Sequence, residues 1–117
     1  MSREKQRQKT RLLRLAEFIE KNPKLYDQGD DANCIVGLGN RLIRGKLQPH
    51  ERANDTVWGG NEYLTKFAKR YGVTVKQARN IFVGDFSDVN RNQRDRSLWG
   101  PSYPKSAVTV LRYLARQ

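Results

Sequence analysis

Cysteine, histidine and long apolar runs are scarce in this sequence, and each scarcity excludes a class of protein. Cys34 is the only cysteine and His50 the only histidine, so the chain can form no internal disulfide and has no Cys/His cluster for zinc. We interpret Cys34 as a small buried apolar residue and His50, beside Pro49, as a solvated loop residue. No apolar run approaches the roughly 20 residues that span a bilayer, and the N-terminus lacks the apolar block of a secretory signal. These absences predict a cytoplasmic protein with no membrane partner.

Groups for catalysis and for cofactor binding are also missing from the sequence. No Ser/His/acid set, no pair of catalytic carboxylates and no phosphate-cradling glycine loop can be assembled. The alternation of Asp88, Asn90 and Asn92 is typical of the first half of a calcium loop. However, Gln93 stands where that loop needs glycine, and Trp99 stands where it needs glutamate. We therefore expect a protein that is not an enzyme and that binds no cofactor, no metal and no small-molecule substrate.

Acidic residues are few in comparison with basic ones. The chain has 12 Asp and Glu against 23 Lys and Arg, a net charge of +11, which favours polyanionic partners such as DNA, RNA or an acidic protein face. Residues 1–14 carry six basic side chains and one Glu, whereas residues 17–31 carry five acids and two lysines. Within residues 1–10 the basic side chains recur at every second position and so circle a helix without forming a face. We expect residues 1–10 to be a mobile basic arm that contacts polyanions, and residues 11–117 to form a single helical domain.

Proline and glycine are also few, with four and nine residues, and several of them stand where an apolar pattern stops. The patterns predict an all-α fold, a compact bundle of about five short helices with no strand. The first helix is expected from about residue 8 to residue 21 and ends before Pro23, because a proline disfavours helical geometry in the preceding residue. We predict one core, built from apolar residues of all the helices: Leu15, Ile19, Leu38, Phe67, Ala68, Ile81, Leu111 and Leu114.

The remaining helices are marked by caps and stops. The second is expected to end at Gly45 and to be short or tightly packed, because Gly37 and Gly39 lower helix propensity; its candidate N-caps are Asp30, Asp31 and Asn33. The third starts at Asn61 and ends at Gly72, the fourth begins with a capping box of Thr74 and Gln77 and closes at Gly84, and the last begins near Pro104. Residues 46–60 are expected to form a loop anchored by Trp58. Residues 85–103 are expected to form a long polar loop, a length that favours a functional or mobile segment.

The stretch FAKRYGVTVKQARNIF, residues 67–82, has the spacing of a helix-turn-helix. Ala68 lets a second helix approach closely, and Gly72, four positions on, makes the turn; Val73, Ala78 and Ile81 would hold the second helix on its partner. Its outer face and leading end carry residue types that hydrogen-bond to base edges or phosphates in the major groove: Thr74, Lys76, Gln77, Arg79 and Asn80. The preceding helix supplies candidate phosphate contacts: Lys66, Lys69 and Arg70.

No acidic residue occurs from Tyr63 to Gly84, so nothing in this stretch repels a phosphate backbone. The leading hypothesis is a small non-enzymatic DNA-binding protein that reads the major groove with residues 74–80. DNA is favoured over RNA. However, any helical hairpin with a glycine turn and a capped second helix shows much the same pattern, and Lys, Gln and Arg are common on solvated faces. The alternative is therefore an accessory protein that binds a host protein or an RNA-rich assembly and modulates it.

Several segments resemble a group of small uncharacterised proteins of actinobacteria and their phages: RLLRLAEFIE, NPKLYD, CIVG, GVTVKQARNIFVG and YPKSAVTVLRYLA. The likeness covers most of residues 11–116. It implies a compact helical domain of phage type and implies no activity. In that group, stretches related to the Gly-x-Thr-x-x-Gln-Ala pattern recur without being evident DNA readers.

Overall fold

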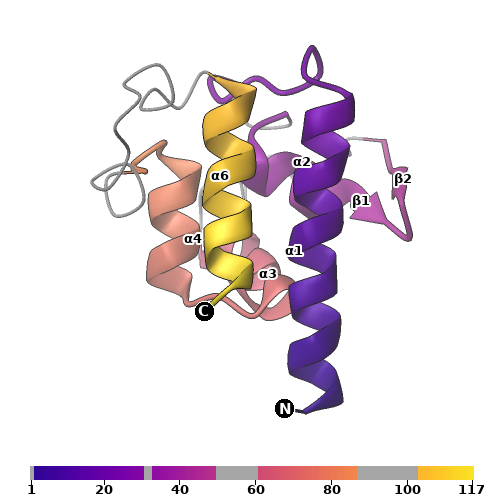
Figure 1. Cartoon of the computed structure of the whole chain (residues 1–117). Helices are drawn as coiled ribbons and strands as arrows, with labels where there is room; N and C mark the ends of the chain where they lie inside the picture. The colour runs from indigo at the N-terminus through magenta and orange to yellow at the C-terminus, as the bar shows by residue number, and fades with distance from the viewer. Residues whose placement is uncertain (1, 31–32, 50–60, 87–102) are drawn as a thin grey trace.

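The computed structural model describes residues 2–30, 33–49, 61–86 and 103–117. Within these ranges the chain forms five helices and one small antiparallel sheet (Figure 1). The elements are α1 (Arg3–Lys21), α2 (Ile35–Arg41), β1 (Leu42–Ile43), β2 (Lys46–Leu47), α3 (Asn61–Tyr71), α4 (Val75–Phe82) and α6 (Pro104–Ala115). The prediction of about five helices is confirmed, and the prediction of no strand is wrong. The expectations for His50, Trp58, the calcium-like residues 88–99 and most of the loop 85–103 fall outside the described residues.

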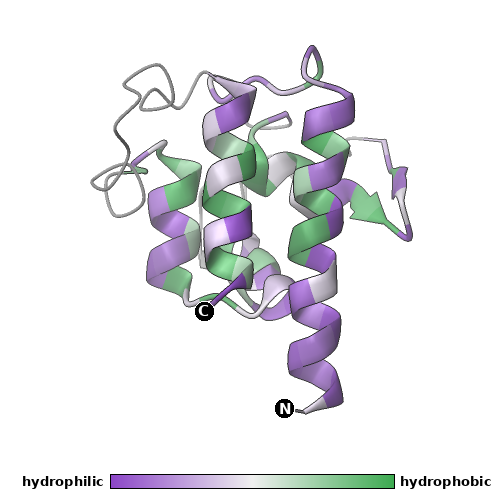
Figure 2. Cartoon of the chain, viewed as in Figure 1, coloured by the Kyte–Doolittle hydropathy of each residue, from purple (hydrophilic) through white to green (hydrophobic). Residues whose placement is uncertain are grey.

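Helices α1 and α6 lie side by side and run in opposite directions (Figure 1). The apolar face of α1, which Leu12, Leu15, Ala16 and Ile19 form, is buried as their helical spacing predicts. The helix begins at Arg3 and not near residue 8, because Ser2 caps it and accepts a 3.1 Å hydrogen bond from the Lys5 backbone N–H. The expected basic arm is thus the strongly hydrophilic first part of α1, as Figure 2 shows. Its mobility stays a prediction.

Helix α2 is short, and a hairpin follows it directly. Its N-cap is Cys34 and none of the three residues expected, since the buried Cys34 Sγ accepts a hydrogen bond from Gly37 N at 3.4 Å. The helix ends at Arg41, and Gly45 lies in the turn between β1 and β2. Arg44 and Gly45 both have positive φ, 51° and 80°, as a two-residue turn between twisted antiparallel strands requires. The expected glycine stop is therefore a hairpin turn.

Gly39 brings α2 against the centre of the core. A Cβ placed on it would lie 2.4 Å from Phe67 Cε2 and 3.0 Å from Leu15 Cδ2, so only glycine admits this approach. Its carbonyl accepts a 2.6 Å hydrogen bond from the buried hydroxyl of Tyr71. The prediction that α2 would be short or tightly packed is confirmed on both counts. Of the eight predicted core residues, seven are buried, and Leu114 is half-buried against the same cluster.

The connection between α1 and α2 holds the end of α4 in place. Gln28 Nε2 donates to the carbonyl oxygens of Ile81 at 2.8 Å and Phe82 at 3.1 Å, the last turn of α4. The hydroxyl of buried Tyr26 donates to Gln28 Oε1 at 3.0 Å. These bonds satisfy carbonyl groups that a helix end leaves without partners. They also fix α4 relative to α1, although Gln28 and Ile81 are 53 residues apart in the sequence.

Candidate nucleic-acid interface

Helices α3 and α4 form the hairpin that the sequence predicted. Gly72 follows α3 with φ of 68°, and Val73 N donates to Ala68 O at 3.1 Å, the long-range bond of a glycine-terminated helix end. Ala78 and Ile81 are buried, so they hold α4 on the rest of the domain. The small residue, the turn glycine and the buried apolar residues therefore lie in this hairpin as the sequence predicted.

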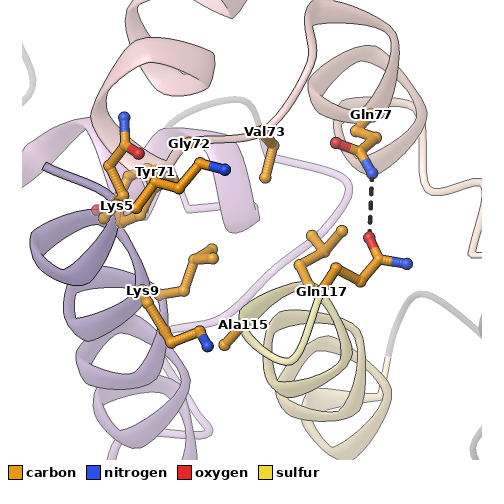
Figure 3. Close-up of a pocket in the computed structure, with 11 residues that line it drawn as sticks. Lys5, Lys9, Tyr71, Gly72, Val73, Gln77, Ala115 and Gln117 are labelled. Carbon is orange, nitrogen blue, oxygen red and sulfur yellow. Dashed lines mark hydrogen bonds between the residues drawn. The ribbon is translucent and has the colours of Figure 1, made fainter. Parts of the chain in front are cut away.

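Thr74 and Gln77 begin α4 as the predicted capping box. Gln77 N donates to Thr74 Oγ1 at 3.0 Å, and Thr74 N donates to Gln77 Oε1 at 2.9 Å. The Gln77 side chain also donates from Nε2 to Gln117 Oε1 at 3.4 Å, at the end of the chain (Figure 3). Both polar atoms of this side chain are thus engaged. In this arrangement Thr74 and Gln77 hold the start of α4, and Thr74 is also exposed.

Arg70 has a structural position that the sequence did not reveal. Its Nη2 donates to the carbonyl of Leu42 at 2.8 Å, which ties α3 to β1. Its guanidinium carbon lies 5.7 Å from the centre of the Tyr71 ring. Its Nε is buried and has no hydrogen-bond partner among the described residues. The half-buried Arg70 is therefore mainly a bridge between elements and not a freely exposed phosphate contact.

Four of the predicted contact residues are exposed cations on the hairpin: Lys66 and Lys69 on α3, and Lys76 and Arg79 on α4. Asn80 is half-buried. Lys76, Arg79 and the exposed Val83 follow the i, i+3, i+7 spacing of one helical face. The hairpin thus presents cations on both helices, and the exposed apolar Val83 is the C-cap that follows α4.

A small pocket of about 280 Å³ lies beside the turn between α3 and α4. Lys5 and Lys9 of α1 line it together with Gly72, Gln77 and Gln117 (Figure 3). Next to them, Gln8 Nε2 donates to the carbonyl of Lys69 at 2.9 Å. The φ of Gly72, 68°, favours glycine, and a Cβ there, 2.5 Å from Gln8 Oε1, would also displace the Gln8 side chain. The first part of α1 therefore supports the hairpin turn.

A second hollow, which we call the arginine cleft, has a volume of about 560 Å³ and lies beside α1 and the β1–β2 turn. Its lining includes five arginines and one exposed apolar residue: Arg7, Arg11, Arg14, Arg44, Arg70 and Ile43. The carbonyl of Arg70 accepts a 2.9 Å hydrogen bond from Arg11 Nη1, which joins α1 to α3. Glu4 Oε1 lies 3.7 Å from the same nitrogen. Sequence reasoning missed this site, because its residues come from three separate segments.

The arginine cleft and α4 occupy different sides of the protein. In Figure 1 the β1–β2 hairpin lies at one edge of the view and α4 at the opposite edge, with α1 and α6 between them. The described residues thus include two separate basic surfaces. One is the exposed face of the α3–α4 hairpin, and the other is the cleft.

Within residues 2–30, 33–49, 61–86 and 103–117, no group of three His, Cys, Asp or Glu could hold a metal ion. In the same ranges no helix is long and apolar enough to cross a membrane. No protein-family model, curated protein or solved structure matches this chain. The interface must therefore be judged on its own residues.

Proposed function

We propose that this chain is a small DNA-binding protein, a regulator of phage type, that reads the major groove with α4. The observation that carries the proposal is the α3–α4 hairpin, in which a positive-φ glycine turn and a complete capping box present exposed Lys76 and Arg79. No acidic residue occurs from Tyr63 to Gly84. A docked hairpin would therefore meet the phosphates without like-charge repulsion.

The residues of the hairpin divide into positioning and contact groups. Thr74 and Gln77 fix the start of α4, so the leading turn enters the groove as a rigid unit. Arg79 and Lys76 can donate to guanine O6 and N7, and Asn80 can pair with adenine. Lys66 and Lys69 of α3 supply phosphate contacts, which orient the protein without reading sequence.

The test compares alanine variants on a preferred site selected from a random duplex library. Arg79→Ala should weaken binding to that site by about 1 to 3 kcal/mol and relax the specificity at one base pair. Lys66→Ala should weaken binding to all duplexes alike and make the salt dependence shallower by about one unit. Because Arg79→Ala and Lys66→Ala each remove one positive charge, a difference between them distinguishes base recognition from a general effect of charge.

The same experiment can contradict the proposal. A specific DNA reader prefers its site over bulk DNA by roughly 10³-fold or more. If selection yields no preferred site, or if Arg79→Ala and Lys66→Ala cause the same uniform loss, α4 does not read bases. A pull-down from cell lysate with and without nuclease then identifies the alternative. A host protein that is retained after nuclease treatment would replace DNA as the partner.

A further inference from the structure

We infer that the arginine cleft is a second nucleic-acid contact, one that binds the phosphodiester backbone. The inference rests on the proposed function in that the ligand is a nucleic acid, but it does not depend on base reading by α4. The cleft groups five guanidinium groups around a single hollow. Guanidinium is a planar fork with five N–H donors, and it matches the oxygens of a phosphate in a bidentate manner.

Two of the five arginines hold the walls of the cleft together through hydrogen bonds to backbone carbonyls. The guanidinium groups of the other three are available to bind a ligand. Arg11 and Arg70 are held by the carbonyls of Arg70 and Leu42, at 2.9 Å and 2.8 Å. In the part of the chain that the structure describes, no hydrogen bond or salt bridge engages the side chains of Arg7, Arg14 or Arg44. Arg7, Arg11 and Arg14 follow i, i+4, i+7 spacing, so they form one stripe along α1. A stripe of this kind can follow successive phosphates.

Arg44 adds an independent observation, because its backbone is in an unfavourable conformation. It has φ of 51° at the first turn position of the hairpin, where Asn, Asp or Gly would be relaxed. A long side chain such as arginine is strained in this region, and such strain concentrates at functional sites. Here the strained residue also lines the cleft. Arginine at this position thus adds positive charge to the cleft, although it makes the turn less stable than Asn, Asp or Gly would.

The lining favours a phosphate backbone over an acidic protein face. All five cationic residues of the lining are arginine, the side chain that binds planar sets of phosphate oxygens best. The exposed apolar Ile43 stands among them and suits contact with a sugar. The hollow of about 560 Å³ is large enough for a phosphate with its neighbouring sugar, within the range of ordinary ligand sites.

The test uses the full chain and a labelled duplex of mixed sequence, with anisotropy measured over a series of salt concentrations. The cleft variant is Arg14→Gln with Arg44→Asn. The control variant is Lys24→Gln with Arg116→Gln. It also removes two positive charges, but from exposed positions outside the cleft. We expect the cleft variant to flatten the salt slope by roughly 0.9 for each lost contact. We expect the control to leave the slope nearly unchanged.

Stability and competition complete the design. Arg44→Asn relieves the strained turn, so the cleft variant should melt no lower than the wild type while it binds more weakly. Equal slopes for the two double variants would overturn the cleft as a site, and so would displacement of the duplex by polyglutamate at an equal concentration of charge. A wild-type chain that binds no nucleic acid overturns the proposed function as well. If the wild-type chain binds nucleic acid but the cleft variant and the control variant have the same salt slope, the cleft alone is overturned.

Discussion

Gly39 lies where α2 meets Leu15 of α1 and Phe67 of α3. A Cβ there would lie 2.4 Å from the ring of Phe67, and that ring is fully buried and packed 4.5 Å from the Tyr71 ring centre. Gly39→Ala should therefore lower the free energy of unfolding, since overpacking costs about 1 to 3 kcal/mol and outweighs the gain of up to about 1 kcal/mol in helix propensity. Denaturant unfolding measures the loss.

Gly29→Ala is the matched control for Gly39→Ala. The nearest atom to a Cβ on Gly29 is Asp27 Oδ1 at 3.4 Å, an ordinary contact, and Gly29 is exposed. This variant should unfold at nearly the wild-type denaturant concentration. If both variants lose the same stability, the close approach of α2 to Phe67 is not what makes glycine necessary.

Tyr71 should make stability sensitive to alkaline pH. Burial raises the pKa of its phenol, and Arg70 partly lowers it again. The unfolded chain therefore releases the proton near pH 10 while the folded chain retains it. The stabilisation is fully present below that pH and is lost as pH rises toward the folded pKa.

Tyr71→Phe separates this effect from other alkaline titrations. The variant should be less stable at neutral pH, because the 2.6 Å hydrogen bond to Gly39 O is lost and its net contribution is about 1 kcal/mol. It should also lose less stability than the wild type between pH 9 and pH 11. Melting curves over that range test both expectations. Parallel pH profiles would show that Tyr71 does not cause the alkaline loss.

Individual residues of the site were predictable by type and not by role. Exposed Lys76 and Arg79 are where helical spacing placed them. The capping role of Gln77 was predicted from its place three residues after Thr74. However, the hairpin sequence does not reveal that Gln77 Nε2 also donates to Gln117. Arg70 looks like a surface cation until its bond to the carbonyl of Leu42, 28 residues away in the sequence, is seen. Roles that depend on partners distant in the sequence leave no local signal.

At the scale of the element, α4 depends on its first turn. Thr74→Ala should destabilise the protein by about 1 kcal/mol, because the capping bond to Gln77 N is lost. Thr10→Ala is a matched control, since Thr10 Oγ1 only donates to the carbonyl of Gln6 within α1 and alanine favours a helix interior. Thermal melting compares the two. A Thr10 variant that is equally destabilised would argue against a special role for the cap.

The helices were more predictable than the elements between them. Apolar spacing, the glycine turn and the capping box are local features, and they predicted α3, α4, the C-terminal end of α1 and the start of α6 close to the observed residues. The β1–β2 hairpin was missed because its strands have two residues each and its turn starts with arginine. The first turns of α1 were missed as helix because they have no apolar face. Their only signal was Ser2 as an N-cap.

At the scale of the whole molecule, the first part of α1 should contribute more to binding than to stability. No residue from Ser2 to Thr10 is buried, so deletion of residues 2–10 should lower the melting temperature little. Binding to nucleic acid should weaken, because Arg7 lines the cleft and further basic side chains are removed. Calorimetry and anisotropy measure the two effects. A large loss of thermal stability would show that the contacts of Gln8 with the hairpin turn dominate.

A full-length variant shows whether the deletion weakens binding through lost charge or through the shorter helix. Replacement of Arg3, Lys5, Arg7 and Lys9 by Gln keeps the length and the Gln8 bond to Lys69 O. It should weaken binding as much as the deletion does. A variant that binds like the wild type would assign the deletion effect to lost structure and not to lost charge.

The distribution of charge over the molecule could not be predicted from the sequence. The boundary expected after residue 10 separates Arg7 from Arg11 and Arg14, so the stripe along α1 was divided between an arm and a domain. Arg44 and Arg70 join that stripe only through the fold. Composition predicts a polyanionic partner, but the place where the basic side chains gather depends on tertiary contacts.

The opposite placement of α4 and the arginine cleft has a consequence for stoichiometry. A duplex is stiff over about 150 base pairs, so a short one lying along α4 cannot turn back to reach the cleft at the other edge of the protein. If both surfaces bind, one molecule tethers two separate duplexes without any second protein copy. The protein would act as a cross-link between duplexes. At low protein concentration it would close loops within one long DNA, and at high concentration it would join several DNA molecules into a network.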